Sequence, residues 1–138
     1  MRPRASISSF VLYSASDARA GAAHAKPLTS ALVWLRRDLR VDDHAALHHA
    51  LTAARRVWCA FVFDRTILDP LPRTDRRVEF IRDSLVDVDA QLHMLGQRAG
   101  VAGVHLIVRH GDAVAQIAGL ARQLGVQAVY ASHDDDPY

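Results

Sequence analysis

Apolar residues occur along this chain in two patterns, compact runs and runs with helical spacing. Four compact runs are rich in β-forming residues, and they lie at residues 31–35, 57–63, 104–111 and 126–132. Continuous apolar runs of this length are typical of parallel strands that are buried on both faces. We therefore expect at least four strands in one sheet.

The segments between these runs carry the spacing of amphipathic helices. The clearest begins at Thr74 and ends at Gly96 or Gly100. Its apolar residues recur every three or four positions and form one stripe: Val78, Ile81, Leu85, Val88, Leu92 and Leu95. Asp42 or Asp43 can cap a shorter helix, whose spacing places these residues on one face: Leu47, Ala50, Leu51 and Ala54. A third helix is expected over 112–125, and a loop over 64–75.

Strands that alternate with helices over short connections predict an α/β fold. Right-handed crossovers would arrange it as a Rossmann-like, doubly wound sheet, mainly parallel, with helices on both faces. This domain spans 31–138, and we expect it to be incomplete at its C-terminal end, because the chain ends directly after a strand. Residues 1–30 are rich in Ala, Ser and Arg, and we expect them to form a disordered extension.

The composition bears on three properties of the protein: nucleic-acid binding, disulfide formation and membrane insertion. The 138 residues carry a formal net charge of +2, which is too small to indicate a nucleic-acid partner. Cys59 is the only cysteine, so no disulfide can form within the chain, and its place in an apolar run predicts a buried, unreactive thiol. No run approaches the roughly 20 apolar residues of a membrane span, so we expect a cytoplasmic protein without a membrane partner.

Charged residues follow every predicted strand at its carboxyl end. They are Arg36, Arg37, Asp38 and Arg40 after the first strand, Asp64 and Arg65 after the second, His110 and Asp112 after the third, and His133 to Asp136 after the fourth. Doubly wound sheets bind ligands outside the carboxyl ends of their strands. The pattern therefore predicts a ligand site at this edge, although a polar loop alone accounts for the charge at any single position.

The spacing of other residues argues against several kinds of site. No G-x-G-x-x-G and no P-loop follows the first strand, so a phosphate cradle of either kind is not expected. His44 and His48 could share one face of a helix, but no third ligand stands at a fixed spacing from them, and we expect no metal. Ser84 and the other serines lack the context of a nucleophile elbow, and we assign no catalytic residue.

Four segments of the chain, taken together, resemble the DNA photolyase and cryptochrome family. "LVWLRRDLRVDDHAAL" at 32–47 resembles the opening signature, a strand followed by Arg-x-Asp-Leu-Arg and an acidic residue. "VFDRTIL" at 62–68 and "RRVEFIRDSLVDVDAQL" at 76–92 resemble the end of the second strand and the following helix. "VYASHDDDPY" at 129–138 resembles the end of the fourth strand. The order and spacing agree across residues 31–138.

The resemblance implies a light-harvesting role for this domain. In that family the N-terminal α/β domain binds an antenna chromophore, a reduced folate or a deazaflavin, which passes excitation energy to FAD. FAD sits in a separate helical domain that also binds damaged DNA, and the whole enzyme is a carbon–carbon lyase that splits pyrimidine dimers. That domain is absent from these residues, so we expect no repair by this chain alone and a possible docking to a separate FAD-binding domain.

The resemblance also implies cofactor-binding positions. The deazaflavin-type pocket maps onto six residues: Arg37, Asp38, Asp64, Arg77, Asp134 and Asp136. Arginine suits phosphate or carboxylate, and aspartate accepts hydrogen bonds from ring N–H groups or ribityl hydroxyls. The folate type has a His before the second helix and an Asn-Glu pair after the fourth strand, where this chain has Leu71 and Pro137-Tyr138, so deazaflavin is favoured.

Three alternatives remain open at this point. The charges from Arg36 to Arg40 account equally well for pairing with another domain as for lining a pocket. The chain could belong to a light-signalling cryptochrome, whose discriminating residues would lie in another domain. It could also be an unrelated Rossmann-like nucleotide-binding domain, although "VRHGDAV" at 108–114 does not supply the glycine-rich loop of that class.

Overall fold

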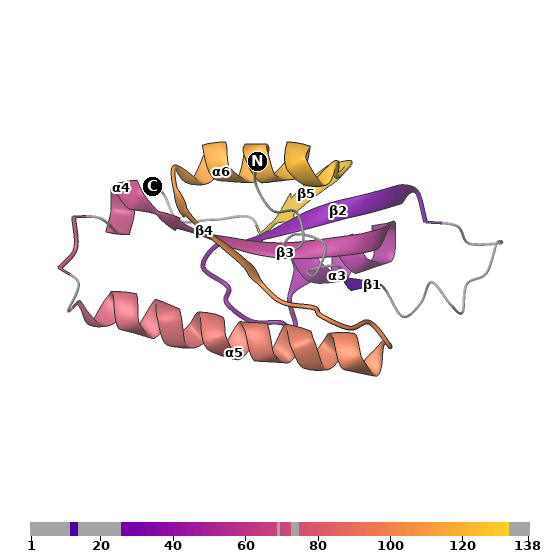
Figure 1. Cartoon of the computed structure of the whole chain (residues 1–138), viewed down its shortest axis with the longest axis horizontal. Coiled ribbons are helices and arrows are strands. Elements are labelled where there is room, and N and C mark those ends of the chain that lie inside the picture. Colours follow the sequence, from indigo (N-terminus) through magenta and orange to yellow (C-terminus); the bar gives the residue numbers. More distant parts are fainter. Residues whose placement is uncertain (1–11, 14–25, 69, 73–74, 133–138) are drawn as a thin grey trace.

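A computed structural model describes residues 12–13, 26–68, 70–72 and 75–132 of the chain. Most of the predicted extension 1–30 lies outside the described residues, and so do the predicted site residues Asp134 and Asp136. The described part forms one twisted sheet with helices above and below it (Figure 1).

The sheet has four parallel strands and one short antiparallel strand. The parallel strands are β2 (Leu28–Leu35), β3 (Ala54–Asp64), β4 (Ile107–Gly111) and β5 (Ala128–Ala131). In the sheet, β3 lies between β4 and β2, and β5 pairs with the other side of β2. Strand β1 (Leu12–Tyr13) pairs antiparallel with Arg56 and Val57 at the start of β3. The direction of strand progression therefore reverses between β2 and β5, which is the topological switch point of a doubly wound sheet.

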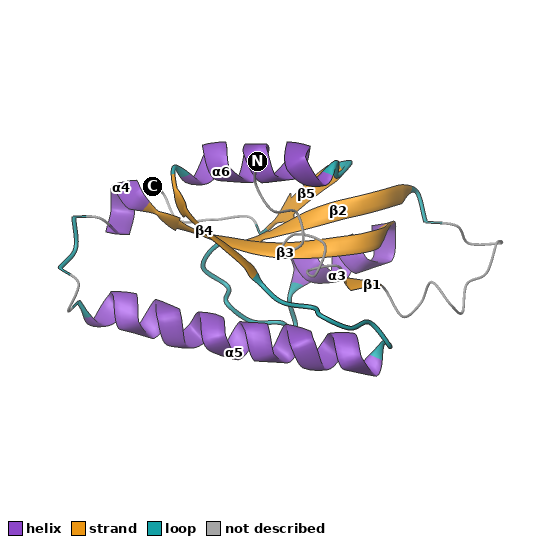
Figure 2. Ribbon diagram, in the orientation of Figure 1, coloured by secondary structure: helices purple, strands orange, loops and turns teal. Residues whose placement is uncertain are grey.

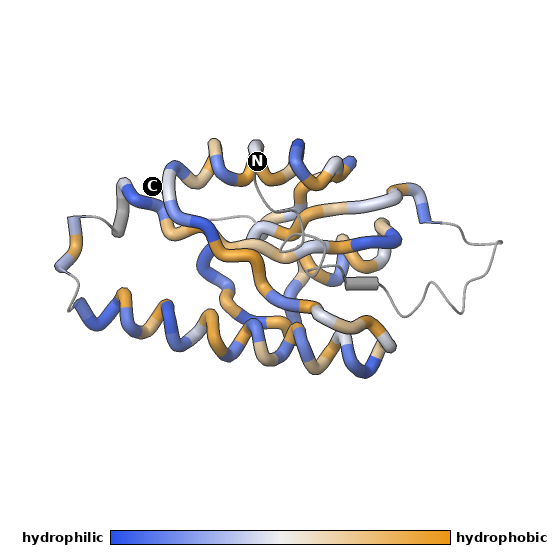
Figure 3. Tube along the Cα trace, in the orientation of Figure 1, coloured by the Kyte–Doolittle hydropathy of each residue, from blue (hydrophilic) through white to orange (hydrophobic). Residues whose placement is uncertain are grey.

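Helices cover both faces, which confirms the predicted fold class. Helices α3 (Ala45–Ala53) and α5 (Arg76–Arg98) lie on one face, and α6 (Ala113–Leu124) lies on the other (Figure 2). A single-turn helix, α4 (Arg65–Leu68), follows β3. Hydrophilic and hydrophobic residues alternate along α5, as its amphipathic sequence predicts (Figure 3).

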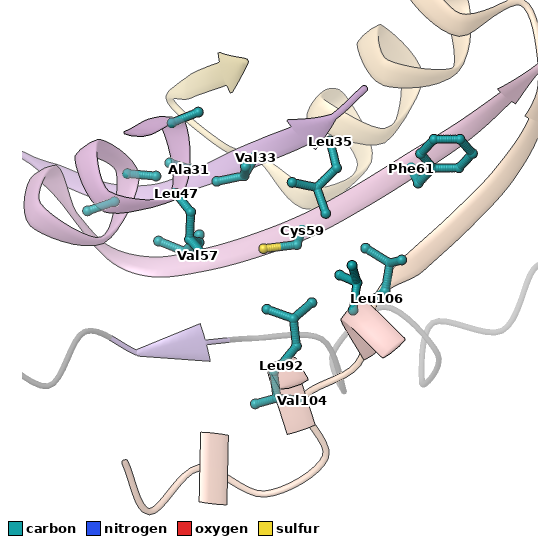
Figure 4. Packing of buried hydrophobic residues seen from close by; sticks show 14 of the residues in the cluster. Ala31, Val33, Leu35, Leu47, Val57, Cys59, Phe61, Leu92, Val104 and Leu106 are labelled. Carbon is teal, nitrogen blue, oxygen red and sulfur yellow. The ribbon is translucent and has the colours of Figure 1, made fainter. Parts of the chain in front are cut away.

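Successive side chains of β2 and β3 enter two different cores. On the side of α3 and α5, Val33 and Leu35 of β2 and Cys59 of β3 pack with Leu92 and Val104 (Figure 4). On the side of α6, Leu32, Trp58 and Ile107 pack with the buried residues of that helix, Ile117 and Leu120. Burial on both faces explains why these strands are continuous apolar runs rather than alternating ones.

Cys59 is as inert as its position in the sequence predicts. Its side chain is 3% exposed, inside the core under α5. Because burial disfavours the thiolate, the pKa of the Cys59 thiol rises to about 12. Only the thiolate is a good nucleophile, so Cys59 serves packing and not chemistry.

The element boundaries differ from the prediction in several places. Strand β2 begins at Leu28 and not at residue 31, because the polar pair Thr29-Ser30 continues the ladder along β3 although it breaks the apolar run. Ala54 belongs to β3 and not to the preceding helix, since its backbone is already extended. The third strand begins at Ile107, and Val104 fills the core from an irregular segment.

Two local interactions fix the ends of short elements. The predicted loop after β3 contains α4, whose first turn is capped by Asp64: Oδ1 accepts hydrogen bonds from the backbone N–H and the hydroxyl of Thr66, at 3.0 and 2.7 Å. At the end of α3, the ammonium of Lys26 donates to the carbonyls of Leu51 and Ala54, at 2.6 and 3.5 Å. A positive charge at that end complements the helix dipole.

Alanine substitutions in α5 should show which of its apolar side chains belong to the core and which lie on the surface. Leu92 is 1% exposed, whereas Met94, two positions along the same helix, is 51% exposed. We expect Leu92→Ala to lower the free energy of unfolding by about 2–5 kcal/mol, because it leaves a cavity under the sheet. Met94→Ala is the matched control and should change it by less than about 0.5 kcal/mol. Urea unfolding followed by circular dichroism measures both, and equal effects would contradict the packing of α5.

Candidate functional site

Three segments meet at the switch point between β2 and β5. Asp38 lies in the loop after β2, Ser132 directly follows β5, and His44 immediately precedes α3. The hydroxyl of Ser132 donates a short hydrogen bond to Oδ2 of Asp38, across 94 positions of the sequence. Nε2 of His44 lies 2.8 Å from the same oxygen. The Asp38 carboxylate therefore joins the ends of the two strands to the start of a helix.

The N-cap residue of α3 is His44 and not the predicted Asp42 or Asp43, because the helix begins only at Ala45. Its side chain is buried, and Nδ1 accepts a hydrogen bond from the backbone N–H of Leu47 at 3.1 Å. Because Nδ1 acts as an acceptor, the neutral ring carries its proton on Nε2, which faces Asp38. The Nε2 contact to Asp38 is short but poorly aligned for a hydrogen bond, so it is chiefly an electrostatic attraction.

The second oxygen of Asp38 is left without a partner. Among the residues that the structure describes, no group donates a hydrogen bond to Oδ1, although this atom is buried. A buried acceptor that lacks a donor costs free energy, and proteins retain such groups mainly where a ligand or another donor completes them. The switch point thus contains a buried acceptor that lacks an N–H or O–H donor among the described residues.

The other predicted site residues at the ends of β2 and β3 lie nearby in the fold but have their own partners. Arg37 is exposed, and its carbonyl accepts a hydrogen bond from the backbone N–H of Leu39, which tightens the loop. Asp64 caps α4 through Thr66. The guanidinium of Arg36 stacks over Trp34, 4.9 Å from the ring centroid, on the face that carries α6.

Arg77 lies in the first turn of α5 and forms a fork with the N-cap residue Asp75. Nε and Nη2 donate to the two carboxylate oxygens at 3.0 and 2.9 Å, and the backbone N–H of Arg77 donates to the same carboxylate. These hydrogen bonds lower the pKa of Asp75 to about 2 and raise the pKa of Arg77. Arg77 is exposed to solvent and Asp75 is partly exposed, so the pair fixes the helix start more than it stabilises the fold.

The structure joins Asp38 to two residues outside the predicted set. Within the described residues, no hydrogen bond or ion pair joins Asp38, Asp64 and Arg77 to one another. Sequence reasoning missed His44 and Ser132 as partners of Asp38. His44 could have been found from its position just before an apolar helix, which is where capping residues stand. Ser132 offered no comparable signal, because its contact with Asp38 depends on the tertiary fold.

Two cavities lie away from the predicted site residues, and His44 lines one of them. One, of about 470 Å³, lies between the start of α3 and α5 and is lined by residues that include Val41, His44, His48 and Leu95. The other, of about 430 Å³, lies between α5 and β4. Neither is lined by a predicted site residue. In the described part of the chain, no three metal-binding side chains are close enough to hold an ion.

Comparison with known proteins decides the family. The sequence model described as DNA photolyase matches residues 31–138, which is most of the chain. This chain belongs to the DNA photolyase family. The alternative of an unrelated Rossmann-like nucleotide-binding domain is therefore excluded.

Relatives of the chain include both photolyases and cryptochromes. The deoxyribodipyrimidine photo-lyase of Synechococcus is 34% identical over 107 residues, covering 78% of this chain and 21% of the relative. A cryptochrome DASH of Natronomonas pharaonis is 33% identical over 109 residues, covering 75% of this chain and 22% of the relative. The chain thus spans about a fifth of the length of these relatives.

A solved photolyase has the same fold in the matched part. The archaeal photolyase of Sulfolobus tokodaii, described as containing two FAD molecules and implying a novel light-harvesting cofactor, is 28% identical, with a TM-score of 0.65. The match covers 79% of this chain and 24% of that protein. The described residues of this photolyase-family domain contain no helix that could cross a bilayer.

The fork between Asp75 and Arg77 should give the domain a measurable acid response. The pKa of Asp75 is about 2 in the folded chain, below the ordinary 3.8, so its contribution to stability is complete above pH 3.8 and disappears as the pH falls through about 2. We expect the stability difference between wild type and Asp75→Asn to shrink as the pH is lowered from about 5 to about 2.

Urea unfolding at several pH values measures this difference. Asp83→Asn, which removes an exposed carboxylate from the same helix, is the matched control and should show a weaker trend. A difference between wild type and Asp75→Asn that stays constant over this range would contradict the fork.

Proposed function

We propose that this chain is the light-harvesting domain of a DNA photolyase and binds a deazaflavin-type antenna chromophore at the carboxyl edge of its sheet. The observation that carries the proposal is the buried, unpartnered Oδ1 of Asp38 at the switch point, in a chain of the photolyase family. Light-harvesting in this family is also supported by the description of the Sulfolobus photolyase, which names such a cofactor for that protein.

The residues at this edge fit a chromophore with polar ring edges. Deazaflavins and reduced folates both carry ring N–H groups, and a carboxylate such as Asp38 can accept hydrogen bonds from them. Two nitrogens of Arg77, Nε and Nη2, donate hydrogen bonds to Asp75, and Nη1 can donate to an anionic or carbonyl oxygen of a ligand. Arg37, Asp64, Asp134 and Asp136 complete the proposed contact set, and the deazaflavin preference rests on the sequence at 71 and 137–138.

The bound chromophore would supply absorption of near-UV or blue light and transfer of that energy to a flavin. The chain's own residues have a simpler task, which is to bind the chromophore and to fix its orientation. FAD, the damaged DNA and the carbon–carbon bond cleavage belong to the FAD-binding domain, to which this chain is proposed to dock. We therefore expect no dimer repair by this chain alone, and a cytoplasmic location is part of the same proposal.

A cryptochrome-type signalling role is the second candidate. It is favoured by the cryptochrome DASH relative, whose identity to this chain nearly equals that of the photo-lyase relative. Both classes would use the same antenna domain, so chromophore binding does not separate them. Repair of a dimer-containing oligonucleotide by a complex of this chain with an FAD-binding domain would separate them.

The proposal is tested by adding 8-hydroxy-5-deazariboflavin to the purified chain. Binding should shift the absorption band and raise the stability of the fold, by about 2.7 kcal/mol when the free chromophore is at one hundred times its Kd. A reduced folate, methenyltetrahydrofolate, forms the second arm and should bind more weakly. Absence of binding by both compounds would overturn the antenna function.

Substitutions at the edge locate the binding site. We expect Asp38→Ala to weaken deazaflavin binding by roughly ten- to a hundredfold, because it removes a charged hydrogen-bond acceptor. Asp42→Ala, an exposed acid of the same loop, is the matched control and should bind as wild type does. Arg77→Gln should also weaken binding, and Arg76→Gln, its exposed neighbour, should not. Equal affinities within each pair, measured by fluorescence titration, would show that the edge is not the site.

A further inference from the structure

The two oxygens of Asp38 have unequal surroundings. Oδ2 receives the Ser132 hydroxyl and lies against Nε2 of His44, whereas Oδ1 has no donor among the described residues. One donated hydrogen bond from Ser132 and the electrostatic attraction of Nε2 both act on Oδ2, and together they favour one rotamer of the carboxylate, which fixes the place of its second oxygen. His44 and Ser132 therefore determine which oxygen of Asp38 is available.

His44 is itself held firmly, and by the protein rather than by solvent. Its imidazole is fully buried, its Nδ1 is committed to the N–H of Leu47, and the next residues of α3 anchor the helix in the core through Ala46, Leu47 and Ala50. The helix cap thus fixes the ring plane and the tautomer together. The proton of this tautomer is on Nε2, where it attracts the negative charge of the Asp38 carboxylate.

The chemistry at Oδ1 selects among ligands. A carboxylate oxygen accepts hydrogen bonds and repels anions, so it suits the N–H or O–H edge of a neutral ring and not a phosphate or carboxylate tail. The same loop also carries exposed arginines at Arg36, Arg37 and Arg40, which suit an anionic tail. A chromophore with both a neutral ring and an anionic tail would therefore orient with its ring toward Asp38.

We propose that His44 is a positioning residue for ligand binding: through its Nε2–H tautomer it holds Asp38 so that Oδ1 receives an N–H or O–H donor of the ring of the bound chromophore. This inference rests on the proposed antenna function and adds to it a residue that does not itself contact the ligand. It also assigns the buried histidine a role that is neither metal binding nor packing alone.

The key variant is His44→Asn. Asparagine is a favourable N-cap residue, so it can replace the bond to Leu47 while it removes the ring nitrogen next to Asp38. We expect His44→Asn to unfold within a few degrees of wild type and to bind 8-hydroxy-5-deazariboflavin roughly tenfold more weakly, with a bound absorption band displaced from that of wild type. His49→Asn, which changes an exposed histidine of α3, is the matched control and should leave both properties unchanged.

A measurement without ligand tests the geometry directly. At about pH 8, where an ordinary histidine is neutral, nitrogen-15 NMR should show His44 with its proton on Nε2. The carboxyl carbon resonance of Asp38 should move in His44→Asn and stay in place in His49→Asn. A proton on Nδ1, or an Asp38 resonance that does not respond, would overturn the inference even if the chromophore binds.

The outcomes separate the two proposals. If wild type binds the chromophore and His44→Asn binds it equally well, the positioning role is wrong and the antenna function stands. If wild type binds neither the deazaflavin nor the reduced folate, the antenna function is wrong and the positioning role falls with it. Weaker binding in His44→Asn alone, together with the expected tautomer, supports both.

Discussion

Burial of β3 on both faces is the constraint on which the rest of the domain depends. A strand with cores above and below it needs helices over both surfaces, and here β2 and β4 also pair along its two edges. Trp58 and Cys59, neighbours in the sequence, enter opposite cores, which obliges α6 and α5 to pack on opposite sides. With β2 and β4 at the two edges of β3, β5 pairs with the far side of β2 and not with β4, and the chain reverses its progression there. The switch point therefore lies beside β2, one strand away from the buried centre of the sheet.

Helix capping accounts for many of the polar side chains at the carboxyl edge of the sheet. Three helices are each preceded by an aspartate that accepts a hydrogen bond from a backbone N–H of the first turn: Asp64 before α4, Asp75 before α5 and Asp112 before α6. His44 does the same with an imidazole nitrogen. Because capping residues are polar, a doubly wound sheet gathers charge at its carboxyl edge for structural reasons. Charge there is a weak sign of a ligand, whereas an acceptor left without a donor, such as Oδ1 of Asp38, is a stronger one.

The fold could be predicted from the sequence because its main signals are local or repetitive. The run at 57–63 and the stripe from Ile81 to Leu95 each report burial directly, and the order of elements follows. Thr29-Ser30 in β2 and the four-residue α4 were missed, since neither is long or apolar enough to show a period. The six proposed site residues came from family resemblance, residue by residue, and stay a prediction. The contact between Asp38 and Ser132 joins positions 94 apart, and no spacing rule reaches that far.

Lys26 has a practical consequence of a different kind. It is the only lysine of the chain, and its ammonium lies on the last carbonyls of α3. Reagents that couple to primary amines have only this side chain and the N-terminal amine as targets. Acylation of Lys26 would remove the positive charge at the end of the same helix whose N-cap residue, His44, lies against Asp38. Fluorescent labelling or surface immobilisation of this domain is therefore better directed to an added cysteine at an exposed position, because Cys59 is buried and slow to react.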